Sequence, residues 1–93
     1  MNALQLFIRA LEERLDTNGT HRGSYVLKQN VETGTFKAYK TYIQEVWLVD
    51  SSNKQLVARA EVKARTINDE EKDEVLESLY YLTIMEVLKY YGI

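Results

Sequence analysis

The chain has 93 residues and a net charge of −2, with 45% hydrophobic and 28% charged residues. These proportions are those of an ordinary globular protein, and the length predicts a single domain over residues 1–93. Because cysteine is absent and His21 is the only histidine, the sequence excludes disulfides, thiolate metal sites and a metal bound by two histidines.

The first predicted element is an amphipathic helix over about residues 3–17. Apolar residues recur there at intervals of three and four, the spacing of one helical face, at Leu4, Phe7, Ile8, Leu11 and Leu15. Asn2 is suited to cap the first turn, and Asn18 followed by Gly19 is a common way for a helix to end. The polar residues 17–24 then form a connecting loop.

Three strands are expected next, over residues 24–31, 35–49 and 54–65. Thr33 and Gly34 suit a two-residue hairpin turn between the first two strands. That turn would set Val31 opposite Phe36, Leu27 opposite Lys40 and Tyr25 opposite Tyr42. The strand over 35–49 is long enough that we expect a bend or a bulge within it.

The strand over 54–65 has the most regular alternation in the chain. One face carries Leu56, Ala58, Ala60, Val62 and Ala64, and the other carries Val57, Arg59, Glu61, Lys63 and Arg65. Alanine is a poor strand former, so we expect these small side chains to let a helix pack close to the sheet. The register that continues this face onto the neighbouring strand sets Val46 opposite Ala58, Tyr42 opposite Val62 and Glu45 opposite Arg59.

The last predicted element is a helix that begins after Asn68, with Glu71 in the capping-box position. Its core stripe is Val75, Leu76, Leu79, Tyr80, Thr83, Val87 and Tyr91. A second apolar group lies on the opposite side and consists of Tyr81, Met85 and Leu88, with Leu82 beside them. The helix is therefore apolar on two sides. A chain of this length has too small a core to bury both of them.

Together these elements predict an α+β fold with the order α-β-β-β-α, in which a three-stranded antiparallel sheet carries both helices on its alanine-lined face. This order resembles the double-stranded-RNA-binding domain in topology. That family places a basic N-terminus of its second helix on phosphates, whereas the helix here begins Asn68-Asp69-Glu70-Glu71. We therefore do not transfer the function of that family.

The outer face of the predicted sheet combines aromatic, apolar and basic side chains: Tyr39, Ile43, Trp47, Lys37, Arg59, Lys63 and Arg65. Several single-strand binders use such a face to stack bases and neutralise phosphates. Residues 22–65 hold eight basic and four acidic residues, while residues 66–93 hold two and seven. However, Glu45 and Glu61 share the outer face, which favours a solvated face or a protein interface over nucleic acid.

Catalytic and metal-binding patterns find little support in the sequence. His21 lies in a polar loop, and the segment from Gly19 to Ser24 lacks the Walker spacing and the strand-to-helix setting of a phosphate-binding loop. The acidic residues from Asp69 to Glu77 are explained by capping and solvation at the start of a helix. We expect no enzymatic activity, no cofactor and no metal.

The leading hypothesis is a small non-catalytic protein–protein interaction module, such as a regulator, adaptor or inhibitor, with a phage or mobile-element accessory protein as one context. It would form a homodimer through the last helix or bind another protein there, with contact residues Tyr81, Met85, Leu88 and Leu82. The alternative is a nucleic-acid-binding or nucleotide-binding protein that uses the outer sheet face. The N-terminus lacks a signal-peptide pattern, and no apolar run approaches the roughly 20 residues of a membrane span. We therefore expect a cytoplasmic protein that does not contact a membrane.

Overall fold

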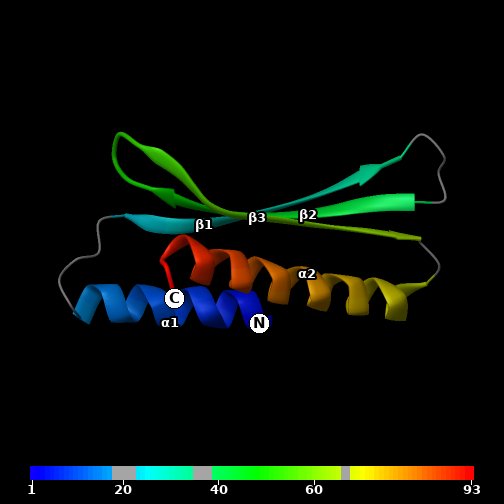
Figure 1. Ribbon diagram of the computed structural model, residues 1–93, viewed down its shortest axis with the longest axis horizontal. Coiled ribbons are helices and arrows are strands. Elements are labelled where there is room, and N and C mark those ends of the chain that lie inside the picture. The colour runs from blue at the N-terminus through cyan, green and yellow to red at the C-terminus, as the bar shows by residue number, and fades with distance from the viewer. Residues whose placement is uncertain (18–22, 35–38, 66–67) are drawn as a thin grey trace.

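The computed structural model describes residues 1–17, 23–34, 39–65 and 68–93. They form five elements in the order α1 (Ala3–Thr17), β1 (Ser24–Thr33), β2 (Tyr39–Val49), β3 (Lys54–Arg65) and α2 (Asp69–Tyr90). The strands form one antiparallel sheet in the order β1-β2-β3, and both helices lie on the same face of it (Figure 1). The predicted α+β fold is confirmed.

The two helices cover different parts of the sheet. α2 packs on β2 and β3, while α1 packs against α2 and the edge strand β1. The main core lies between the layers and includes Leu4, Ile8, Val46, Ala58 and Val87. A second cluster, nearer the start of α2, contains Tyr42, Ala60 and Leu79. Ala58 and Ala60 are buried, in agreement with the expectation that small side chains on β3 admit a helix.

Both helices begin with an asparagine cap. The Oδ1 atom of Asn2 accepts a hydrogen bond from the Gln5 backbone N–H at 2.9 Å, and the Asn2 backbone N–H donates to Gln5 Oε1 at 2.9 Å. Asn68 Oδ1 accepts from the Glu71 backbone N–H at 2.9 Å. Each cap pairs an N–H that has no partner within the helix. The two predicted N-caps are confirmed, and they define where each helix starts.

The register between β1 and β2 differs from the prediction. Val31 lies opposite Tyr42, Leu27 opposite Val46 and Tyr25 opposite Leu48, six positions further along β2 than expected. Because six is even, each residue of β1 keeps its predicted face. The shift sets Leu27 against the fully buried Val46 instead of a lysine, which apolar cross-strand pairing favours.

The predicted two-residue turn is therefore wrong. β1 continues through Thr33, and the Gly34 N–H donates to the Tyr39 carbonyl at 3.1 Å across a longer connection. Thr-Gly lacks the strong preference for this turn that Asn-Gly and Asp-Gly have, so the pairing of the strands decides the register. Phe36 and the rest of residues 35–38 lie outside the described residues.

β2 and β3 pair in the predicted register until a bulge interrupts it. Val46 lies opposite Ala58, Tyr42 opposite Val62 and Glu45 opposite Arg59, as predicted. The next pair is Trp47 with Leu56, which leaves Val57 as an extra residue on β3. The irregularity expected in the second strand thus occurs beside Trp47, but its extra residue belongs to β3.

The bulge exchanges the faces of two neighbouring residues. Val57, predicted on the outer face, is 5% exposed and packs in the main core. Leu56, predicted on the inner face, is 39% exposed and lies beside Trp47 on the outer face, away from the helices. In a bulge two residues oppose one, so the strict alternation of faces is reset there. The predicted faces of these two residues are therefore wrong.

Candidate interaction surfaces

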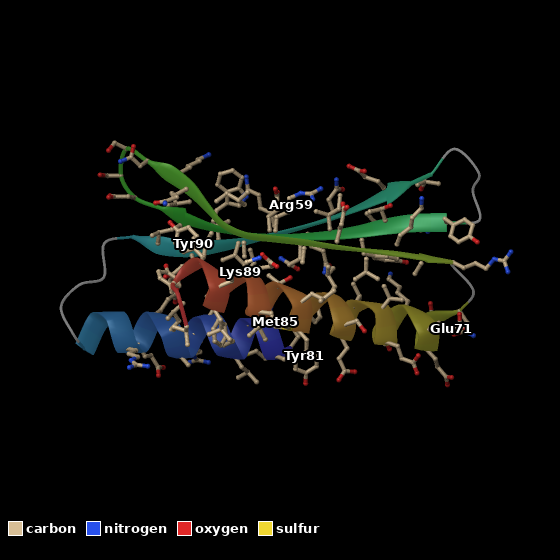
Figure 2. All side chains as sticks on the ribbon, in the orientation of Figure 1. Arg59, Glu71, Tyr81, Met85, Lys89 and Tyr90 are labelled. Carbon is tan, nitrogen blue, oxygen red and sulfur yellow. The ribbon has the colours of Figure 1, made fainter. Side chains whose placement is uncertain are left out.

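The side of α2 that faces away from the sheet carries three large apolar side chains. Tyr81, Leu82 and Met85 are 53%, 43% and 64% exposed. Leu79 and Val87, on the sheet-facing side of the same helix, are fully buried. Figure 2 shows Tyr81 projecting from α2 away from the sheet. The structure thus places three of the four predicted contact residues on one exposed side, which we call the α2 patch (Tyr81, Leu82 and Met85).

Leu88, the fourth predicted contact residue, lies at the boundary of this patch. It is partly buried and lines a shallow groove of about 260 Å³ between α1 and the C-terminal end of α2. The other lining residues are Phe7, Ala10, Leu11, Arg14 and Ile93. Helical spacing puts Leu88 on the same side as Met85, but the position of α1 partly covers it. That position is a tertiary feature, which spacing along one helix does not contain.

The outer face of the sheet has an apolar row that crosses all three strands. Val26, Trp47 and Leu56 lie side by side on β1, β2 and β3. Val26 is 38% and Leu56 is 39% exposed, while Trp47 is partly buried. Sequence reasoning missed Leu56 because the bulge moves it to this face. It also missed Val26, which the alternation of β1 between the inward residues Tyr25 and Leu27 was sufficient to place.

The aromatic residues predicted as a stacking platform have cations of the same chain beside their rings. The Lys28 ammonium lies 5.6 Å from the ring centroid of Trp47, and the Arg65 guanidinium lies 5.9 Å from that of Tyr39. The indole N–H of Trp47 is buried without a hydrogen-bond partner among the described residues. Ile43, a predicted contact residue, is only 7% exposed and offers no contact surface. A base would have to displace these cations before it could stack.

The basic residues of the outer face are partly neutralised. Arg59 forms a 3.2 Å ion pair with Glu61 along β3, and Glu45 lies opposite Arg59 on β2. Lys63 is exposed, while Lys37 lies outside the described residues. The face therefore suits a polyanion less well than its list of basic residues indicated.

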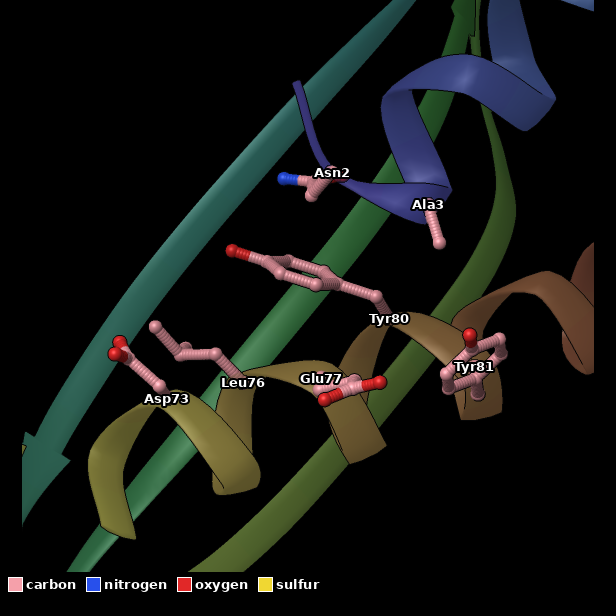
Figure 3. A pocket seen from close by; sticks show the side chains of 7 residues that line it. All are labelled: Asn2, Ala3, Asp73, Leu76, Glu77, Tyr80 and Tyr81. Atoms are coloured by element: carbon pink, nitrogen blue, oxygen red, sulfur yellow. The ribbon is translucent and has the colours of Figure 1, made fainter. Parts of the chain in front are cut away.

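An open cavity of about 450 Å³ lies where α1 begins beside α2 (Figure 3). Its lining residues are Asn2, Ala3, Asp73, Leu76, Glu77, Tyr80 and Tyr81. Tyr80 extends toward β1, where its hydroxyl accepts a hydrogen bond from Gln29 Nε2 at 3.3 Å. Asp73 and Glu77 are exposed residues, so this lining lacks the enclosed setting typical of a small-molecule site.

Tyrosines connect the C-terminal end of α2 to the sheet. The Tyr25 hydroxyl on β1 lies 2.5 Å from the Tyr91 hydroxyl, and the Tyr90 hydroxyl accepts a hydrogen bond from Gln55 Nε2 on β3. Burial and the hydrogen bond to Tyr91 raise the pKa of Tyr25 above its ordinary value of 10.0. The Tyr25 backbone N–H donates to Glu12 Oε1 of α1 at 3.2 Å. Tyr91, predicted as a core residue, is 38% exposed and reaches β1 through its hydroxyl.

The described part of the chain was searched for metal-binding clusters and for helices that could cross a membrane. Residues 1–17, 23–34, 39–65 and 68–93 contain no group of three or more acidic or histidine residues that could hold a metal. Of the helices that the structure describes, none is long and apolar enough to cross a membrane. Residues 18–22, which include His21 and the predicted helix end at Asn18 and Gly19, lie outside the described residues. Comparisons with protein-family models, curated proteins and solved structures found no match.

Proposed function

We propose that this chain is a non-catalytic protein–protein interaction module that forms a homodimer through the α2 patch. The observation that carries the proposal is that three large apolar side chains are exposed together on a helix whose other side holds the fully buried Leu79, Thr83 and Val87. A surface helix ordinarily presents polar residues to solvent. Grouped exposed apolar residues mark contact sites, and tyrosine and methionine are enriched in protein interfaces.

The length of α2 is sufficient for such a contact. Its 22 residues span about 33 Å at a rise of 1.5 Å per residue. A stable interface buries about 800 Å² on each partner, which a helix of this length and its flanking side chains can supply. A second copy presents the same patch again, so a two-fold axis lets each apolar side chain contact another one.

Sedimentation velocity at micromolar concentration tests the proposal with one variant and a matched control. Met85→Glu places a charge in the α2 patch and is expected to give a monomer. Leu56→Glu makes the same kind of change on the outer sheet face and is expected to leave a dimer. Circular dichroism checks that both variants remain folded. If the unmodified protein sediments as a monomer and Met85→Glu behaves identically, the proposed interface is wrong.

A further inference from the structure

Exposed residues of α2 follow one another at intervals of four, beginning with Asp69 and Asp73. The last four residues of this row are Glu77, Tyr81, Met85 and Lys89. Residues four apart are neighbours on a helix surface and together form a ridge that winds slowly around it. Figure 2 shows Tyr81, Met85 and Lys89 in succession along α2. This ridge has an acid at one end, a base at the other and two large apolar side chains between them.

The charged ends of the ridge have no ion-pair partner within the described part of the chain. The ion pair found there joins Arg59 to Glu61 on the far face of the sheet. Glu77 and Lys89 are both exposed and are separated by twelve residues, which is about 18 Å along the helix. They are therefore too far apart to pair with each other within one copy, and both are available to a partner.

We propose that the two copies cross with their α2 helices antiparallel, so that Glu77 of each copy meets Lys89 of the other. This inference rests on the proposed homodimer and specifies its geometry. A two-fold contact that sets Glu77 against Lys89 also sets Tyr81 against Met85, since each pair is equally distant from the same midpoint. The dimer then has an apolar centre with an ion pair at each end.

The parallel orientation of the two α2 helices would bring like charges together. A parallel pair of helices around a two-fold axis places Glu77 against Glu77 and Lys89 against Lys89, and like charges in contact are unfavourable. The antiparallel register also keeps the remaining acids of this side apart. Asp73, the next exposed acid along the same row, then lies opposite Ile93 of the other copy and far from the second Asp73. Ridges of residues spaced by four commonly pack into each other's grooves, at about −50°.

Charge reversal followed by rescue tests the ion pairs. Glu77→Lys alone and Lys89→Glu alone each turn two attractions into repulsions, and we expect each to weaken the dimer Kd roughly tenfold. The double variant Glu77→Lys/Lys89→Glu restores opposite charges and is expected to return the Kd to within about twofold of the unmodified protein. The antiparallel register would be overturned if the double variant had a dimer Kd as weak as that of either single variant. It would also be overturned if the single variants had the same dimer Kd as the unmodified protein.

Cysteine cross-linking tests the same register independently, because the chain has no cysteine of its own. An equimolar mixture of Glu77→Cys and Lys89→Cys is expected to form a disulfide-linked heterodimer on oxidation, while one native ion pair remains at the other end. Each variant alone is expected to stay unlinked, since its two cysteines lie about 18 Å apart and a disulfide needs Cα atoms within about 7 Å.

The outcomes separate this inference from the proposed function. If the unmodified protein dimerises but Glu77→Cys cross-links to itself as readily as to Lys89→Cys, the helices are parallel and only the inference fails. If the unmodified protein is monomeric throughout the micromolar range, both the dimer and its geometry are rejected.

Discussion

The α2 patch and the outer face of the sheet both carry apolar side chains, but they differ in what covers them. On the sheet, the ammonium group of Lys28 lies near the ring of Trp47, which is itself partly buried. On α2, Tyr81 and Met85 are more than half exposed, and no cation lies over the Tyr81 ring among the described contacts. A face rich in aromatic and basic residues is thus not necessarily open to a ligand, because its own cations can lie over the faces of the aromatic rings.

The difference follows from the geometry of the two elements. In a sheet, each residue has neighbours directly and diagonally across the adjacent strand, and long side chains reach both. Lys28 lies opposite Glu45 and next to the row that contains Trp47, so it can bend over that ring. On a helix the surface neighbours are three and four residues away, and for Met85 these include Tyr81 and Leu82. The apolar residues of α2 therefore adjoin one another.

The largest expected effect tests whether the bulge places Val57 on the inner face of the sheet and Leu56 on the outer face. Val57→Glu is expected to lower the free energy of unfolding by about 3 kcal/mol or more, because it places an unpaired carboxyl group in the core. Leu56→Glu, one residue away, is expected to cost less than about 1 kcal/mol because Leu56 lies on the outer face. Urea unfolding of the two variants measures both values. The reverse order would mean that the unbroken alternation of the sequence is correct and the bulge is not.

An intermediate effect is expected from the buried tyrosine that joins β1 to α2. Because the folded-state pKa of Tyr25 is raised, its stabilising contribution is present below the ordinary value of 10.0 and is lost as the pH rises beyond it. We expect the free energy of unfolding to fall between about pH 9.5 and about pH 11, the range around the ordinary tyrosine pKa. In Tyr25→Phe the free energy of unfolding should fall less steeply over the same range. Tyr81→Phe, on the exposed side of α2, serves as the control and should keep the unmodified slope. Equal slopes for Tyr25→Phe and the unmodified protein would contradict this role.

The smallest expected effect concerns the cover over Trp47. Lys28→Ala removes the ammonium group near the ring and should cost at most about 1 kcal/mol of stability. Because Trp47 is the only tryptophan, its fluorescence reports on this position alone. We expect acrylamide to quench it more strongly in Lys28→Ala than in the control Lys63→Ala. Unchanged quenching in Lys28→Ala would show that the lysine does not shield the ring.

Much of the fold could be predicted because it depends on local chemistry. Asn2 and Asn68 cap helices through hydrogen bonds three residues away, and the alternating alanines of β3 fix which face meets α2. The pairing of Val46 with Ala58 follows from the same alternation.

The errors concern features that depend on distant parts of the chain. Val57 and Leu56 are both apolar, so nothing in their own sequence shows that a bulge exchanges their faces. The β1–β2 register is fixed by apolar pairing across the sheet and not by the turn residues. Leu88 is partly covered because of where α1 lies, and the contact between Tyr25 and Tyr91 joins residues that are 66 positions apart in the sequence. In each case tertiary packing decides what local spacing leaves open.

Sedimentation equilibrium of the unmodified protein tests most directly whether α2 joins two copies. Over a micromolar concentration series, the account predicts an average mass that rises toward twice the chain mass of 10.9 kDa. The same series with Met85→Glu should remain at the mass of a single chain. A mass of 10.9 kDa for the unmodified protein at the highest concentration would contradict the central claim.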